Sequence, residues 1–151
     1  VILHPLSDDR RILTVEKTGE ELHAPDDFML VISYNPGYQH ILKDLKPSTR
    51  QRFISLEFDY PPEDIEAEIV ANESGLDSAT AIRLVAAGRR MRKLVDSGLE
   101  APPGTRLLVH AGTIMKHGLG VKEACEAAIV RPITDDAELH KAMMDILDAS
   151  F

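Results

Sequence analysis

The sequence has little of what stabilises extracellular and membrane proteins. It has no tryptophan and a single cysteine, Cys125, in 151 residues. One cysteine excludes an internal disulfide and favours a reducing compartment, for which we expect the cytoplasm. No apolar run approaches the roughly 18–20 residues that cross a bilayer, and residues 1–3 are too short to form a secretory signal. Because Cys125 has Glu123 and Glu126 nearby, which raise the pKa of a thiol, we expect it to be buried and unreactive.

Basic residues are also few. Lysine and arginine number 17 against 25 acidic residues, which gives a net charge of −8, whereas nucleic-acid binding requires a basic surface. One predicted helix carries a basic set without interleaved aromatic residues: Arg83, Arg89, Arg90, Arg92 and Lys93. This pattern favours a solvated face, or a contact with an acidic partner, over nucleic-acid binding. We therefore expect no nucleic-acid partner and no membrane insertion.

The histidines do not have the spacing of a metal site. The chain has six of them, and His110 and His117 stand seven positions apart. Structural zinc sites typically contain pairs of ligands separated by two to five residues, a spacing that these histidines do not show. We therefore assign no metal ligand in this chain.

Residues 1–60 have the pattern of part of an α/β domain. Residues 11–15 and 21–23 are separated by a polar turn and predict a β-hairpin. The apolar run 28–32 does not alternate, which is typical of a strand buried on both faces of a parallel sheet. Residues 53–58 alternate, with Ile54, Leu56 and Phe58 on one side. A short helix is predicted over 38–45 between these two strands.

Residues 61–151 are predicted to be entirely helical. The helices are bounded by prolines and glycines and by capping acidic residues. The predicted segments are 62–75, 77–98 with Asp77 as the cap, 105–118, 121–130 ended by Pro132, and a last helix that Asp135 and Glu138 begin as a capping box. The predicted fold is thus an α/β remnant, a hairpin plus two strands, followed by an all-α bundle.

Four polar residues are candidates for chemistry on phosphate groups. Asn35 ends a predicted buried strand, where α/β sheets bind ligands, although Asn-Pro-Gly is also a good turn. Arg50 and Arg52 lie just before the second predicted strand, and a planar guanidinium matches the charge of a transferring phosphoryl group; a solvated basic turn explains them equally well. Arg106 lies in the first turn of a helix, against the helix dipole, which suits a site for an anion or an exposed side chain.

The phosphate-binding loop that such residues accompany is absent from these 151 residues. The pattern G-x-x-x-x-G-K-[ST] occurs nowhere in the chain, and this loop holds the phosphates of ATP in P-loop enzymes. We therefore expect the chain by itself neither to bind ATP tightly nor to hydrolyse it.

Six segments, spread in order over nearly the whole chain, resemble a known family. They are residues 30–39 (LVISYNPGYQ), 43–53 (KDLKPSTRQRF), 58–61 (FDYP), 68–75 (EIVANESG), 105–109 (TRLLV) and 132–136 (PITDD). Together they are similar to the C-terminal portion of MoxR-class AAA+ ATPases, in the CbbQ/NorQ branch. The resemblance implies that 1–60 is the C-terminal part of the AAA+ core and that 61–151 is the helical lid domain.

The resemblance also implies roles for the candidate residues. Asn35 would be the sensor 1 amide, and Arg52 the arginine finger that acts on the ATP of a neighbouring subunit, with Arg50 beside it. Arg106 would be the sensor 2 arginine of the lid. The whole protein would use ATP and Mg²⁺.

The family further implies partners. The subunits would form a homo-oligomeric ring, expected to be a hexamer, which acts with a partner that carries a von Willebrand factor A domain. The ring would remodel a client enzyme, such as rubisco or nitric oxide reductase. The alternative is a freestanding, non-catalytic helical module that binds a partner without nucleotide.

Overall fold

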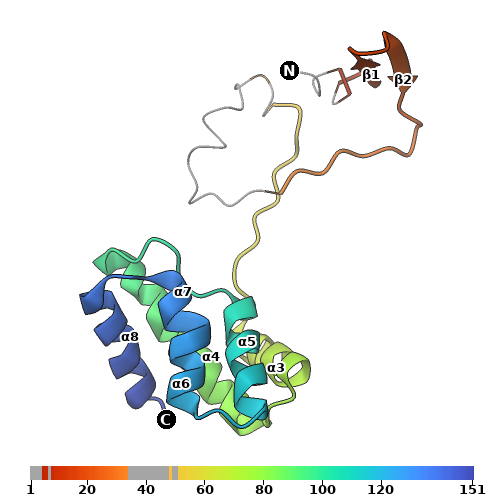
Figure 1. Cartoon of the computed structure of the whole chain (residues 1–151). Coiled ribbons are helices and arrows are strands. Elements are labelled where there is room, and N and C mark those ends of the chain that lie inside the picture. The colour runs from red at the N-terminus through yellow and green to blue at the C-terminus, as the bar shows by residue number, and fades with distance from the viewer. Residues whose placement is uncertain (1–4, 7, 34–47, 49–50) are drawn as a thin grey trace. The chain divides into compact units, whose positions relative to one another are not determined.

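The structure is a computed structural model, and it describes residues 5–6, 8–33, 48 and 51–151. Figure 1 shows the course of the chain. The chain divides into two compact units, Val1–Glu57 and Phe58–Phe151, and each is described by itself. The helix predicted over 38–45 lies outside the described residues.

The first unit contains the predicted hairpin. Strands β1 (Ile12–Val15) and β2 (Glu20–His23) pair antiparallel, with Ile12 opposite His23 and Val15 opposite Glu20. The amide of Gly19 donates to the carbonyl of Val15 at 2.8 Å and closes the turn. The prediction of a hairpin here is confirmed.

The two further strands predicted in this unit are wrong for the described structure. Residues 28–33 and 54–57 have no regular secondary structure, and neither has Phe58, the last residue of the second predicted strand. Met29 and Val31 are each 77% exposed, and Ile54 is 93% exposed. A strand needs a neighbour for its backbone hydrogen bonds, and among the described residues β1 and β2 pair only with each other. Without a partner strand, these apolar segments have no sheet to join.

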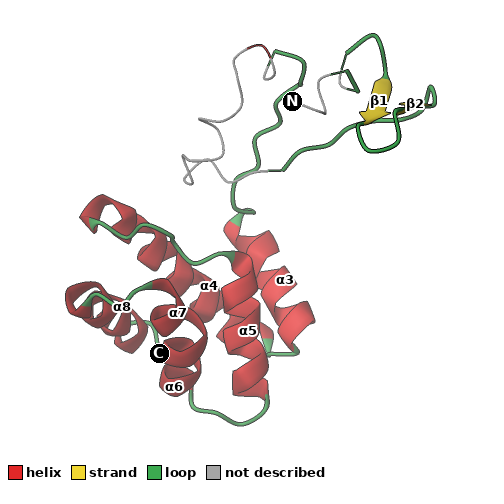
Figure 2. Ribbon diagram, turned by 45° about the horizontal axis from the view of Figure 1, so that its top comes forward, coloured by secondary structure: helices red, strands yellow, loops and turns green. Residues whose placement is uncertain are grey.

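The second unit is the predicted all-α bundle (Figures 1 and 2). A 3₁₀ turn, η1, extends the second helix, and a π-helical turn, η2, joins the fourth helix to a short continuation. The elements are α3 (Glu63–Ser74), α4 (Ser78–Arg92), η1 (Lys93–Ser97), α5 (Thr105–Lys116), α6 (Val121–Cys125), η2 (Glu126–Val130), α7 (Arg131–Ile133) and α8 (Ala137–Asp148).

Most helix ends follow the sequence signals. Gly75 stops α3 with a φ of 73°, and Gly98 ends the 3₁₀ extension of α4 with a φ of 98°. Glycine adopts this left-handed conformation without steric strain. Asp77 caps α4 by accepting a hydrogen bond from the amide of Thr80 at 2.9 Å. These boundaries confirm the predicted ones.

Two boundaries were predicted wrongly. The side chain of Asp136, not Asp135, caps α8, and it accepts from the amides of Glu138 and Leu139. The helix that begins at Val121 also continues through Pro132 to Ile133. The amide of Arg131 donates to the carbonyl of Glu126, five residues back. This widened turn comes directly before Pro132, where a regular helix would lose a hydrogen bond and meet a steric clash.

The core of the bundle lies where α5 packs against α3 and α4. Two glycines allow the helices to approach closely. A Cβ on Gly88 would lie 2.8 Å from Leu108 Cδ2, and a Cβ on Gly112 would lie 2.7 Å from Ser74 Oγ. Glycine is therefore required at both contacts unless a neighbour moves.

The buried face of α3 is not purely apolar. Ile65 is 45% exposed, whereas the next residue, Glu66, has no exposed surface. A fully buried carboxylate is rare unless it is paired.

Within the described residues, no helix combines the length and apolar character that crossing a bilayer requires.

Candidate functional site

The four candidate residues are unevenly covered by the structure. Asn35 and Arg50 lie outside the described residues. Arg52 belongs to the first unit and Arg106 to the second.

Arg52 contacts an acidic side chain and a backbone carbonyl. Its Nη2 lies 3.5 Å from Oδ2 of Asp8, and its Nη1 donates to the carbonyl of Ser48 at 3.3 Å. Asp8 also accepts from Arg10 Nη2 at 2.7 Å and from Arg10 Nε at 3.0 Å. The hydrogen bonds from Arg10 outweigh the opposing effect of desolvation and lower the pKa of Asp8 to about 2. Arg52 thus lies beside an ionised carboxylate.

Arg106 is exposed and is the second residue of α5. The residue before this helix, Gly104, supplies no side-chain cap. The direction of the Arg106 side chain therefore depends on what fixes the first turn of α5.

A buried polar cluster lies at this turn. We call Glu66, Arg92 and Thr105 the Glu66 cluster. Oε2 of Glu66 accepts from Arg92 Nη1 at 2.8 Å, and Oε1 accepts from Arg92 Nη2 at 2.5 Å. The hydroxyl of Thr105 donates to the same Oε1 at 2.7 Å. One carboxylate from α3 thus binds the end of α4 and the start of α5.

Arg92 extends the cluster to two connecting segments. Its side chain is 9% exposed, and its Nε donates to the carbonyl of Pro103 at 2.9 Å. Its guanidinium carbon lies 3.6 Å from the centre of the Tyr60 ring, a cation–π distance. The guanidinium therefore bonds both the segment before α3 and the segment before α5.

The cluster holds Glu66 in its ionised form. Burial raises the pKa of Glu66, but hydrogen bonds from Arg92 and Thr105, together with the positive charges of Arg92 and Arg89, outweigh burial and lower it below the usual 4.5. A two-point arginine–carboxylate pair is among the stronger hydrogen-bonded contacts in proteins. The charges of Glu66 and Arg92 are thus balanced inside the bundle.

Comparisons with known proteins match both units. Residues 66–150 match the family model described as CbbQ/NirQ/NorQ C-terminal. The chain belongs to the CbbQ/NirQ/NorQ family. Residues 1–53 match an AAA domain model of the dynein-related subfamily. The family resemblance inferred from the sequence is confirmed.

Curated relatives give the extent of the likeness. The chain is 52% identical over its whole length to Protein NorQ of Paracoccus denitrificans, and covers 56% of it. It is 48% identical over its whole length to the denitrification regulatory protein NirQ of Stutzerimonas stutzeri, and covers 55% of that protein. It is 52% identical to Protein CbbQ of Hydrogenophilus thermoluteolus, over 95% of this chain and 54% of the relative. The chain spans about half the length of the curated relatives it matches.

Sequence reasoning missed the Glu66 cluster. Arg92 was expected on a solvated face or against an acidic partner, and its partner is Glu66 of the same chain. The contacts join residues 26 and 39 positions apart, which no local motif reveals. One signal was present: Glu66 lies four residues before the buried Val70 and so shares the inner face of its helix.

Arg83, another member of the basic set on α4, also contacts residues of the same helical unit. Arg83 donates to the carbonyls of Ser150 at 2.9 Å and Phe151 at 2.8 Å. Its guanidinium carbon lies 4.6 Å from the centre of the Phe151 ring. At least two of the basic residues of α4 therefore serve packing within the domain.

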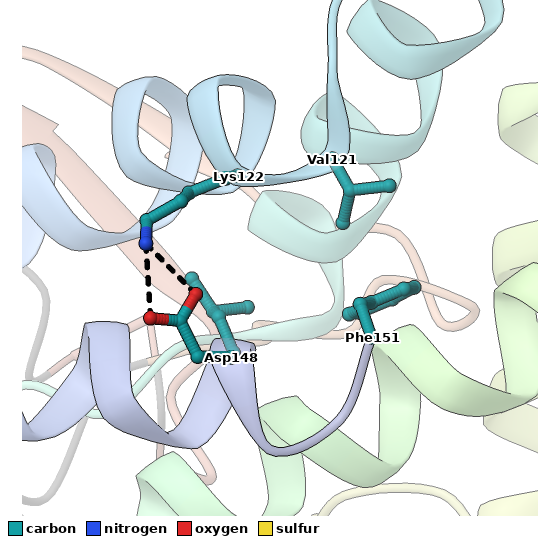
Figure 3. A pocket seen from close by; sticks show the side chains of 5 residues that line it. Val121, Lys122, Asp148 and Phe151 are labelled. Carbon is teal, nitrogen blue, oxygen red and sulfur yellow. Dashed lines mark hydrogen bonds and ion pairs between the residues drawn. The ribbon is translucent and has the colours of Figure 1, made fainter.

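A sizeable cleft and a smaller hollow open on the described surface of the helical domain. The cleft has a volume of about 700 Å³ and lies beside Tyr60, Arg89, Arg90 and Lys93. The hollow measures about 130 Å³, and on its rim Lys122 Nζ lies 2.9 Å from each Asp148 oxygen (Figure 3). The hollow is too small for a nucleotide or a drug-sized ligand.

Neither metal ligands nor an active thiol are seen in the described part of the chain. No group of three or more histidine, cysteine or acidic residues is arranged there to hold a metal ion. Cys125 is buried in α6, as predicted, and burial raises the pKa of its thiol to about 12. This thiol is therefore protonated at neutral pH and is no nucleophile.

Proposed function

We propose that this chain is the sensor and lid portion of an AAA+ ATPase that remodels a client enzyme. The observation that carries the proposal is the order of the family matches. An AAA domain model over residues 1–53 is followed directly by the CbbQ/NirQ/NorQ C-terminal model over 66–150. We assign 1–60 to the α/β core and 61–151 to the helical lid.

The proposed chemistry is phosphoryl transfer from ATP to water, with Mg²⁺ bound by the full-length protein. Asn35 orients the attacking water through its amide. Arg52, with Arg50 beside it, neutralises the charge that develops on the transferred group. Arg106 contacts the nucleotide from the lid.

The proposed finger acts between subunits. A finger that reaches the ATP of a neighbour requires a head-to-tail contact, and such contacts close into rings. We propose a hexameric ring that works with a partner carrying a von Willebrand factor A domain, in the cytoplasm. The contact of Arg52 with Asp8 is long, 3.5 Å, and joins two partly exposed side chains, which supports this assignment because such a pair can open at modest cost when the arginine changes partner.

The names of the relatives suggest which client enzyme the protein acts on. One 48% identical relative is called a denitrification regulatory protein. We propose that the client is nitric oxide reductase or, as in the CbbQ branch, rubisco.

The test is ATP hydrolysis by the full-length protein that contains this segment. Arg52→Ala should lower kcat by about 10³ or more, as loss of an arginine finger does. Arg10→Ala is the matched control, because Arg10 pairs with the same Asp8. Its kcat should stay near that of the wild type.

Two results would overturn parts of the proposal. Near wild-type hydrolysis by Arg52→Ala would remove Arg52 as the finger. A full-length protein that binds its client but neither binds nor hydrolyses ATP would support the alternative, a non-catalytic helical binding module.

A further inference from the structure

We propose that the Glu66 cluster positions Arg106 by fixing the first turn of α5. Glu66, Arg92 and Thr105 are then positioning residues, and the inference rests on the proposed role of Arg106 at the nucleotide.

The start of α5 lacks the usual means of fixation. Helices commonly begin with a serine, threonine, aspartate or asparagine whose side chain binds a free backbone amide. Gly104 occupies this position and offers no side chain. The amide of Leu107 donates to the carbonyl of Gly104 at 3.0 Å, but Gly104 has no side chain that could bind the amides of the first turn.

The Glu66 cluster holds the residues on both sides of Gly104. Arg92 Nε binds the carbonyl of Pro103, and Glu66 Oε1 binds the hydroxyl of Thr105. The two-point contact between Glu66 and Arg92 joins these two bonds into a closed ring. Both ends of the Pro103–Gly104–Thr105 turn are therefore tied to one buried ion pair.

Fixing Thr105 also fixes the position of the next residue, Arg106. Successive residues of a helix are about 100° apart around its axis. With the Thr105 hydroxyl fixed inward, the backbone of Arg106 is fixed too, and its side chain is exposed. A change in the rotation of this turn would redirect a long side chain whose contact with nucleotide tolerates shifts of only about 1 Å.

The experiment is a double-mutant cycle in the full-length protein, with ATP hydrolysis as the readout. Arg106→Ala should lower kcat/KM for ATP by about 10²-fold, and Thr105→Val by about tenfold, mainly through KM. The double variant should equal Arg106→Ala alone, because Thr105 acts only through Arg106. Thr105→Ser, which keeps the hydroxyl, should return kcat/KM to within about twofold of the wild type.

A matched control lies on the same helix. Thr113 is partly buried, and its hydroxyl donates to the carbonyl of Val109 at 2.9 Å. Thr113→Val removes one threonine hydroxyl from α5 without touching the Glu66 cluster, so KM should not change. The melting temperature of every variant separates a loss of folded protein from a loss of positioning.

The outcomes distinguish the two proposals. If Arg106→Ala leaves hydrolysis unchanged, the proposed role of Arg106 fails, and the positioning role fails with it. If Arg106→Ala impairs hydrolysis while Thr105→Val does not, or while the two effects multiply in the double variant, only the positioning role is overturned. Equal activity of Thr105→Ser and Thr105→Val would also contradict it.

Discussion

The two units differ in whether their apolar side chains are buried or exposed. Among the described residues, every fully buried apolar side chain belongs to Phe58–Phe151. The described part of Val1–Glu57 instead exposes Met29, Val31, Ile54 and Leu56. Both units contain apolar segments, and yet among the described residues only the second unit forms a core.

The difference follows from where each kind of element finds its hydrogen bonds. A helix satisfies its backbone from residues four positions away and then needs only a neighbouring helix. A strand needs another strand, which can lie far away in the sequence. A helical lid is therefore complete within its own stretch of chain, whereas part of a sheet is not.

Removing the carboxylate of Glu66 is expected to have the largest effect on the helical unit. Glu66→Ala leaves Arg92 charged and nearly buried, so the free energy of unfolding should fall by about 3–5 kcal/mol. Urea unfolding of this 151-residue chain, followed by helical circular dichroism, measures the change. Glu63→Ala is the control, because its pair with Arg89 is exposed and spans 3.4 Å; it should lose less than about 1 kcal/mol. Equal losses would show that burial does not decide the strength of these pairs.

Lowering the pH should reduce the free energy of unfolding of the helical unit, because Glu66 becomes protonated. The loss should be smaller than that caused by Glu66→Ala. The folded-state pKa of Glu66 lies below its unfolded value of 4.5. Its contribution is therefore complete above that pH and is lost as the pH falls through the lower, folded value. The difference in unfolding free energy between wild type and Glu66→Gln should thus stay constant near neutral pH and shrink as the pH falls from 4.5 through the lower, folded value. A constant difference would contradict a carboxylate held ionised by its partners.

The cap of α8 allows a smaller and more local test. Asp136→Ala should reduce the unfolding free energy by about 1 kcal/mol, because two amides lose their acceptor. Asp135→Ala, one residue earlier, should change it by less than about 0.5 kcal/mol. Thermal unfolding of the two variants decides which aspartate is the cap. A larger loss for Asp135→Ala would restore the boundary expected from the sequence.

The first unit should give the smallest effect in this chain. Leu56 is 77% exposed. Leu56→Ser should therefore change the unfolding free energy of this chain by less than about 0.5 kcal/mol. In the full-length protein the same variant should cost about 2 kcal/mol, if further strands bury the side chain. Urea unfolding of both lengths makes the comparison. No effect in the full-length protein would mean that residues 53–58 stay outside the sheet there too.

The sequence predicted best what depends on near neighbours. Gly75, Gly98 and Asp77 end or begin helices through bonds that span a few residues, and these boundaries were correct. The cap of α8 was predicted one residue too early, because Asp135 and Asp136 have the same side chain and the sequence does not distinguish them. The π turn before Pro132 was not anticipated, since a proline ordinarily ends a helix.

The sequence failed where distant residues meet. The Glu66 cluster depends on how three helices pack, and a pattern of helical period shows only which side of each helix is apolar. Arg92 was grouped with its basic neighbours for this reason, although it is the one that pairs with Glu66. The roles of Asn35, Arg50, Arg52 and Arg106 came from family resemblance, and they stay predictions.

The glycine contacts of α5 have a mechanical consequence. At Gly88 and Gly112 the helices leave no room for even one added carbon, and close-packed interiors transmit strain instead of absorbing it. Sliding α5 along α3 or α4 would require neighbouring side chains such as Leu108 and Ser74 to move. A displacement of α5 would therefore press on side chains of both α3 and α4.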